Sequence, residues 1–116
     1  MKKQASGKII NIADVAGISP WPDFIAYSAS KAGLISITKG LAKALAPDVQ
    51  VNAIASGTVL IHEEASEKYK RQVADQTLLK RVGKPEDIVN TVLFLLQGSD
   101  YVTGTVVTVD GGRLLA

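Results

Sequence analysis

Cysteine is absent from this chain of 116 residues, and histidine and tryptophan each occur once. Without cysteine the chain can form neither a disulfide framework nor a thiolate metal site. The lone histidine, His62, rules out a histidine-based metal cluster, and we expect it in an exposed loop. With 47% hydrophobic and 21% charged residues, the composition is that of a soluble globular protein, for which a cytoplasmic location is the default.

Long hydrophobic runs and a strong charge of one sign are also lacking. No stretch approaches the roughly 18 consecutive apolar residues of a membrane span, and no apolar segment follows Met1-Lys2-Lys3 as a signal peptide requires. The net charge of +2 comes from 13 basic residues spread among 11 acidic ones. Because this is a weak electrostatic footprint, we do not expect nucleic acid as a partner, and the lack of an apolar span leads us to expect no membrane partner.

Hydrophobic periodicity predicts strands that alternate with helices. Short apolar runs rich in β-branched residues predict buried strands at 8–13, 49–55 and 102–109. Helical spacing predicts helices at 26–46 and 85–98, and one or two exposed helices within 63–80. Continuous apolar strands separated by helices indicate the α/β class, with a parallel sheet covered on both faces. Residues 1–116 are expected to form a single domain whose narrow sheet, with two unpaired edges, something else completes.

Tyr27 and Lys31 stand four positions apart in the first predicted helix. This spacing places them on one face, about 6 Å apart along the axis. A phenol with a pKa of about 10 exchanges protons poorly at neutral pH. A neighbouring ammonium lowers that pKa, so Tyr27 is a candidate general acid/base. Lysines are frequent in this chain, however, and the spacing alone is weak evidence.

The segments around this pair make it specific. They are Asn11-Ile12-Ala13-Asp14, Tyr27-Ser28-Ala29-Ser30-Lys31-Ala32-Gly33-Leu34, Val51-Asn52-Ala53-Ile54-Ala55-Ser56-Gly57, Tyr101-Val102-Thr103-Gly104 and Val109-Asp110-Gly111-Gly112. In this order they resemble the C-terminal half of the short-chain dehydrogenase/reductase family, over nearly the whole chain. The resemblance implies part of a doubly wound, Rossmann-like parallel sheet of about three strands with flanking helices.

The resemblance also implies roles for particular residues. Tyr27 matches the family's catalytic tyrosine, which exchanges a proton with the substrate as hydride moves to or from nicotinamide. Lys31 matches the lysine that lowers the pKa of the tyrosine and binds the nicotinamide ribose. Gly57, Thr58 and Val59 match the loop whose backbone meets the nicotinamide carboxamide. The cofactor implied is NAD or NADP, the substrate a small molecule, and residues 58–80 match the substrate lid.

Two positions depart from the family pattern. The family's serine usually stands thirteen positions before the tyrosine, where this chain has Asp14. An aspartate here resembles the pteridine reductase branch, and it could relay a proton if burial raised its pKa. Asp14 could instead simply cap the turn before Gly17, a reading that we rank second. The other departure is Ser56, where the family usually has proline, and it affects only the stiffness of the loop.

The nucleotide-binding features of the family are missing. The chain contains no glycine-rich turn to cradle a pyrophosphate, and neither the family's Asn-Asn-Ala-Gly segment nor its catalytic asparagine. The leading hypothesis is therefore a catalytic half, inactive until a separate nucleotide-binding half is supplied. An alternative is a non-catalytic oligomerisation module, because the family's Tyr27-bearing helix and last strand lie at subunit interfaces. A third is a complete small enzyme that binds nucleotide by an unfamiliar route.

Other chemistry-bearing residues carry less weight. Trp21 and Phe24 could line a substrate pocket or simply pack together. Glu63, Glu64 and Glu67 share a predicted helical face, which is far more typical of a solvated surface than of a metal site.

Overall fold

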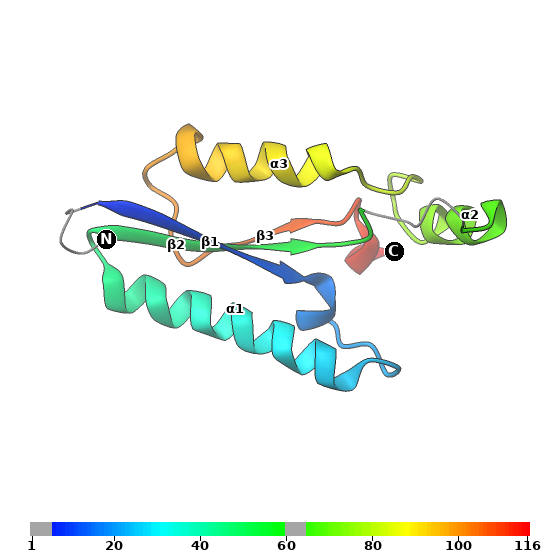
Figure 1. The fold of residues 1–116 in the computed structure, drawn as a ribbon, viewed down its shortest axis with the longest axis horizontal. Helices are drawn as coiled ribbons and strands as arrows, with labels where there is room; N and C mark the ends of the chain where they lie inside the picture. The colour runs from blue at the N-terminus through cyan, green and yellow to red at the C-terminus, as the bar shows by residue number, and fades with distance from the viewer. Residues whose placement is uncertain (1–5, 60–64) are drawn as a thin grey trace.

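The computed structural model describes residues 6–59 and 65–116, and it confirms the predicted α/β class (Figure 1). Its strands and α-helices are β1 (Gly7–Asp14), α1 (Ile25–Leu45), β2 (Val49–Ser56), α2 (Glu67–Asp75), α3 (Pro85–Leu93) and β3 (Val106–Val109). Short helical turns follow β1, α3 and β3, namely η2 (Val15–Gly17), η3 (Phe94–Gly98) and η4 (Arg113–Leu115). His62, Glu63 and Glu64, for which the sequence predicted a loop and a solvated face, lie outside the described residues.

The sheet is parallel, with the strand order β1-β2-β3. The β1–β2 register pairs Gly7 with Val49 at one end and Asp14 with Ser56 at the other. β2 is therefore the central strand, and Val51, Ala53 and Ile54 on it are fully buried. Strands that are covered on both faces read as continuous apolar runs, which is why the sequence predicted them.

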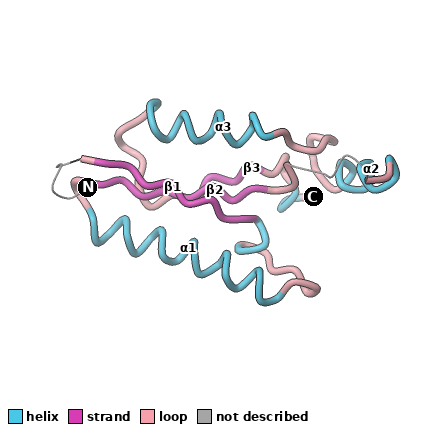
Figure 2. Tube along the Cα trace, viewed as in Figure 1, coloured by secondary structure: helices cyan, strands magenta, loops and turns pink. Residues whose placement is uncertain are grey.

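One helix covers each face of the sheet, as the sequence predicted (Figure 2). α1 packs against β1 and β2, and α3 packs against β2 and β3 on the opposite face. The two connections step across the sheet in the same direction, yet their helices lie on opposite faces. The two crossovers therefore have opposite hands, and one of them is the left-handed form that parallel sheets almost never use.

The inner face of α1 differs in one position from the predicted apolar stripe. The sequence placed Leu34, Ile37, Leu41 and Leu45 at helical spacing, but Ile37 is 55% exposed. The residues of α1 that are buried are Ser28, Thr38 and Ala42. Small side chains let the helix lie close to the sheet, and Thr38 Oγ1 accepts a hydrogen bond of 3.0 Å from Asn11 Nδ2 of β1.

The last strand is shorter than the predicted range of 102–109, because β3 begins at Val106. Asn52 explains the difference, since its side chain, 3% exposed, binds the segment before β3. Its Nδ2 donates to Val102 O at 2.9 Å, and its Oδ1 accepts from Thr105 N at 3.0 Å. Gly104, with a φ of +72°, interrupts the extended backbone between these contacts. Side-chain hydrogen bonds thus replace part of the strand ladder.

The two later helices agree with their predicted ranges in outline. Within the described part of 63–80 there is one helix, α2, whose N-cap Ser66 accepts a hydrogen bond from Tyr69 N at 3.1 Å. α3 begins at Pro85 as predicted, and it continues into the wider turn η3, which ends at Gly98. Among the described residues, no helix is both long and apolar enough to cross a membrane.

Candidate active site

The candidate site lies at the carboxyl end of the sheet, where the first turn of α1 faces the ends of β1 and β2. Asp14 is the last residue of β1, and it is paired in register with Ser56 at the end of β2. Tyr27 lies in the first turn of α1, which follows the loop after η2. In open α/β sheets, ligands bind beyond the carboxyl ends of the strands, so this edge is the expected place for a site.

Asp14 and Tyr27 are in direct contact although they stand thirteen positions apart in the sequence. The phenol hydroxyl of Tyr27 donates a hydrogen bond of 3.1 Å to Asp14 Oδ2. Asp14 Oδ1 accepts a second hydrogen bond, of 2.8 Å, from Ala16 N at the start of η2. The capping role that the sequence analysis ranked second is therefore present on one carboxylate oxygen, while the other oxygen contacts the tyrosine. The role of Asp14 in proton transfer stays a prediction.

Lys31 lies on the same face of α1 as Tyr27, as the spacing predicted. Its Nζ is 5.7 Å from the centroid of the Tyr27 ring, within the range of a cation–π contact. The same ammonium donates a hydrogen bond of 3.3 Å to Ile12 O on β1. Among the described contacts this uses one of its three N–H groups, which leaves donors for a bound hydroxyl or carbonyl group.

The electrostatics of Tyr27 differ from the sequence-based expectation. Burial and then the hydrogen bond to Asp14 raise the pKa of Tyr27 above its ordinary value. We expected Lys31 to lower it, but the phenol oxygen lies 3.1 Å from a carboxylate oxygen, whereas Lys31 Nζ lies over the ring. A neighbouring negative charge opposes formation of the phenolate. In this chain the tyrosine is accordingly held as a protonated acid.

Replacing Asp14 by Asn is expected to lower the pKa of Tyr27. The change removes the carboxylate charge that disfavours the phenolate, and an amide oxygen can still accept the hydrogen bond. Alkaline titration followed by phenolate absorbance measures the shift, with Tyr27→Phe assigning the transition to this tyrosine. An unchanged Tyr27 transition in Asp14→Asn would contradict the assigned cause.

The raised pKa of Tyr27 also links folding to pH. Because the pKa of Tyr27 is higher in the folded than in the unfolded chain, the stability that Tyr27 contributes is fully present below the unfolded pKa. That stability is lost as the pH rises through the folded pKa.

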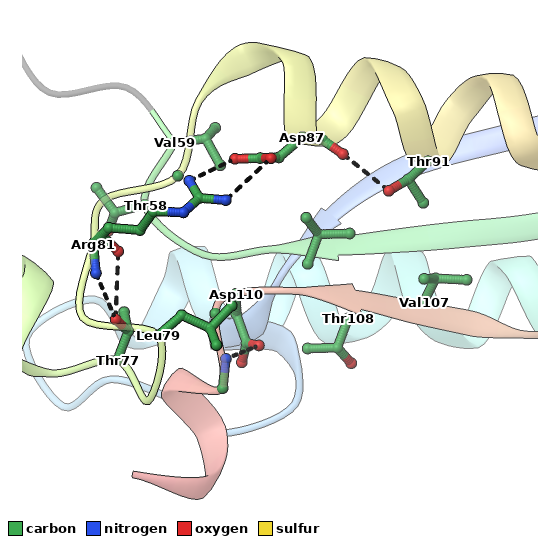
Figure 3. Close-up of a pocket in the computed structure, with 14 residues that line it drawn as sticks. Thr58, Val59, Thr77, Leu79, Arg81, Asp87, Thr91, Val107, Thr108 and Asp110 are labelled. Carbon is green, nitrogen blue, oxygen red and sulfur yellow. Dashed lines mark hydrogen bonds and ion pairs between the residues drawn. The ribbon is translucent and has the colours of Figure 1, made fainter.

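The loop after β2 carries Gly57, Thr58 and Val59, the residues that resemble the coenzyme loop. Gly57 N donates to Val109 O at 2.9 Å, and Thr58 O accepts from Gly83 N at 3.0 Å. Thr58 and Val59 line a cavity of about 450 Å³ between the end of β3 and the start of α3 (Figure 3). None of Asp14, Tyr27 and Lys31 is among the described residues that line this cavity. The loop therefore borders two separate regions, this cavity and the Asp14–Tyr27–Lys31 cluster.

Two aromatic residues border the Tyr27 side of the site. Trp21 and Phe24 pack edge to face, with ring centroids 6.2 Å apart, and together with Tyr27 they line an open hollow of about 250 Å³. The packing reading is therefore confirmed, whereas binding of a substrate in the hollow stays a prediction. The buried hydroxyl of Ser28 fixes the loop by accepting from Trp21 N at 3.1 Å. The sequence analysis assigned Ser28 no such role, and its signal is a polar residue directly after Tyr27.

Close packing of η2 on α1 sets the distance between Asp14 and Tyr27. A Cβ at Gly17 would lie 2.7 Å from the backbone carbon of Lys31, so Gly17→Ala must push the two segments apart. We expect a loss of about 1–3 kcal/mol in the free energy of unfolding. Gly40→Ala is the matched control, because nothing lies within 4 Å of its Cβ position on α1, and it should stabilise by roughly 0.5–1 kcal/mol. Urea unfolding measures both, and equal effects would contradict the packing argument.

The fold and this edge define a class: a parallel α/β sheet of Rossmann type that carries a tyrosine and a lysine one helical turn apart. A family model described as "Enoyl-(Acyl carrier protein) reductase" matches residues 1–113. The chain belongs to the short-chain dehydrogenase/reductase family. Among the described residues, no group of three or more histidine, cysteine, aspartate or glutamate side chains is arranged to hold a metal ion.

Curated relatives include two kinds of reductase. The chain is 45% identical over 120 residues to the 3-oxoacyl-[acyl-carrier-protein] reductase FabG of Aquifex aeolicus, which covers 97% of this chain and 47% of that protein. It is 40% identical over 111 residues to the dihydromonapterin reductase of Enterobacter sp., covering 96% of this chain and 46% of that protein. The chain thus spans about half the length of these relatives.

Solved structures agree with the fold. A structure of ElxO with NADP bound superposes on the whole chain with a TM-score of 0.89 at 28% identity, over 50% of that protein. An apo SCOR enzyme from Clostridium thermocellum gives a TM-score of 0.84 at 38% identity, covering 98% of this chain and 44% of that protein. The predicted Rossmann-like sheet is therefore confirmed as the sheet of this family.

Proposed function

We propose that this chain carries the proton-transfer half of an oxidoreductase site that uses a nicotinamide coenzyme. The observation that carries the proposal is the cluster at the end of β1, in which Tyr27 donates to Asp14 and lies beside Lys31. Family membership supports oxidoreduction as the reaction class. Residues 1–116 are then a single catalytic domain, the C-terminal half of such an enzyme.

In this proposal Tyr27 is the general acid. The Tyr27 residue is 42% exposed and faces the hollow beside Trp21 and Phe24, and its phenol carries a proton at neutral pH. In the direction of reduction the tyrosine gives this proton to the substrate atom that becomes negative. Asp14 accepts the hydroxyl hydrogen bond beforehand and orients it, and the ammonium of Lys31 offsets the negative charge that remains on the phenol oxygen.

The coenzyme would be NAD or NADP, whose reduced form would supply the hydride. The residues present fit the nicotinamide end of such a molecule, because Lys31 retains N–H donors and the backbone of Gly57, Thr58 and Val59 forms the loop that begins beside Asp14. Lys31 would bind the ribose, and the loop would bind the carboxamide. The NADP-bound neighbour ElxO supports the use of this coenzyme class.

The substrate is proposed to be a small molecule with a C=O group or a pterin-like C=N group. Asp14 favours the second kind, because a carboxylate stabilises a nitrogen that becomes protonated, whereas it cannot donate a hydrogen bond to a carbonyl oxygen. The dihydromonapterin reductase relative agrees with this choice, and the 3-oxoacyl-[acyl-carrier-protein] reductases agree with the first. The pteridine-type reading is therefore the finer part of the proposal.

Activity is proposed to require a nucleotide-binding half in addition to these residues. The sequence contains no glycine-rich turn for the coenzyme phosphates. The test mixes the chain with the N-terminal half of a related reductase and follows reduced-nicotinamide absorbance with a 3-oxoacyl thioester or a dihydropterin. Turnover by the mixture and none by either half supports the proposal. A mixture that shows no turnover and binds no coenzyme would overturn it.

The contribution of Asp14 to substrate choice can be tested in the same mixture. Asp14→Ser restores the family's hydroxyl, and we expect it to raise the turnover of the thioester relative to that of the dihydropterin. An unchanged ratio would show that Asp14 does not affect substrate choice.

Titration of the chain alone with NADH and NADPH, followed by Trp21 fluorescence, separates this proposal from a complete small enzyme, which would bind either coenzyme unaided.

A second candidate function is a non-catalytic oligomerisation module, in which case the partner is another copy of the chain. It is favoured by large apolar side chains exposed on both helices that cover the sheet and on the turn η3 after α3, namely Ile25, Ile37, Val89, Leu93 and Phe94. Surfaces of this kind commonly lie in interfaces. Gel filtration with light scattering discriminates, because a clean monomer at all concentrations counts against this function and leaves the catalytic proposal intact.

A further inference from the structure

The turn that follows β3 is closed by one carboxylate. Asp110 Oδ1 accepts a hydrogen bond of 2.9 Å from Gly112 N, and Oδ2 accepts one of 3.0 Å from Leu114 N. Its own carbonyl oxygen accepts a third, of 3.1 Å, from Arg113 N. Gly111 and Gly112 have φ values of +61° and +83°, which glycine adopts without strain. The carboxylate of Asp110 therefore fixes the path of the backbone through this turn.

This turn lies directly against the first residue of the proposed coenzyme loop. A Cβ at Gly57 would stand 3.0 Å from both Cα and Cβ of Asp110. Gly57 N also donates to Val109 O, the residue before Asp110, at 2.9 Å. With no side chain between them, a shift of the Asp110 backbone is transmitted to Gly57.

The same turn also holds the loop from a second side. Leu79 N donates to Gly111 O at 3.0 Å, so the turn anchors the segment that connects α2 to α3. Four residues further on, Gly83 N donates to Thr58 O at 3.0 Å. Figure 3 shows Thr58, Leu79 and Asp110 around one cavity. The segment from Leu79 to Gly83 forms part of its wall. The Gly57–Val59 loop is therefore hydrogen-bonded on one side to the end of β3 and on the other to the segment before α3.

We infer that Asp110 is a positioning residue for the Gly57–Val59 loop, which it aligns for the nicotinamide coenzyme without touching it. The inference rests on the proposed function for the identity of the ligand, but the positioning itself is a property of the chain. It adds a residue from the turn after β3 to a site otherwise built from β1, α1 and the loop after β2. The sequence shows Asp110 only as part of a segment that resembles the family.

Asp100 offers a matched control for Asp110. Its carboxylate binds Lys8 Nζ at 2.9 Å at the other end of the sheet, and its side chain is exposed. Asp110→Asn and Asp100→Asn remove the same charge, but only the first replaces an acceptor by an amide N–H in front of a backbone donor. A difference between the two variants at the loop therefore reports position rather than net charge.

Amide hydrogen exchange of the full chain, resolved by NMR, tests the positioning. In Asp110→Asn the amides of Gly57, Leu79 and Gly83 should exchange about tenfold faster, because one hydrogen bond of the turn is lost. The amide of Val51, in the buried part of β2, should change less than about twofold, as should all four amides in Asp100→Asn. Equal acceleration at Val51 would mean that Asp110 serves only global stability, and no change at Gly57 would equally overturn the inference.

Gly57→Ala tests the same contact from the opposite side and remains informative if Asp110→Asn does not fold. The added Cβ would press on Asp110, so the amides of Gly112 and Leu114 should exchange faster than in the parent chain. Unchanged exchange in the turn would overturn the inference.

The link to function is measured in the reconstituted enzyme. Asp110→Asn should raise KM for the coenzyme about tenfold and change kcat by less than about threefold, because a misplaced loop weakens binding of the coenzyme rather than proton transfer. A loss confined to kcat would contradict positioning. If the parent mixture neither turns over nor binds coenzyme, the proposed function fails while the exchange result stands. If it turns over but Gly57 exchange is unaffected in Asp110→Asn, only the role of Asp110 fails.

Discussion

Replacing Tyr27 by Phe is expected to lower turnover of the reconstituted enzyme by about 10²–10⁴, the range that a positioned general acid contributes. The substitution removes only the hydroxyl, which donates a hydrogen bond of 3.1 Å to Asp14, so the ring still lines the hollow with Trp21 and Phe24. The loss should fall on kcat, because the proton moves in the transition state and the binding contacts are retained. Initial rates over a range of substrate concentrations measure it.

Tyr101→Phe is the matched control for this experiment. Tyr101 is 99% exposed in the segment before β3, so its hydroxyl can be removed without changing either the site or the packing. Its variant should keep the turnover of the parent mixture. If Tyr27→Phe also kept full turnover, the proton would have to come from another group, and the proposed role of Tyr27 would be wrong.

Replacing Ile54 by Ala is expected to cost about 2–5 kcal/mol of the free energy of unfolding. Ile54 is fully buried on the central strand, between the helices that cover the two faces, and its deletion leaves a cavity that rigid neighbours cannot fill. Single domains are stable by only about 5–15 kcal/mol, so this one change removes a large share of the total. Urea unfolding monitored by Trp21 fluorescence measures the loss.

Ile37→Ala makes the same chemical change at a half-exposed position of α1. We expect its effect to stay within about 0.5 kcal/mol, because little apolar area is lost and alanine is the better helix former. A cost for Ile54→Ala no larger than that for Ile37→Ala would show that β2 is not the centre of the core.

Much of the fold could be predicted because its signals are local. The strands are short β-branched runs bounded by glycine or proline, and the boundaries of α1 and β2 differ from their predicted ranges by a single residue. The misplaced start of β3 has a non-local cause. Asn52 lies about 50 residues earlier in the sequence, and its side chain takes the hydrogen bonds that strand pairing would otherwise make.

The sequence by itself determined that Tyr27 and Lys31 share a face, because a spacing of four residues in a helix permits nothing else. It also determined the α/β class and the order of the segments by which the family was identified. Only the tertiary structure decided that Asp14 accepts the Tyr27 hydrogen bond, because the two are joined by a loop whose path depends on the packing of Gly17 against α1. Burial of Tyr27 and then that contact raise the tyrosine pKa, the opposite of the expected direction. Electrostatics depend on distances across the fold, and a sequence pattern specifies distances only within one element.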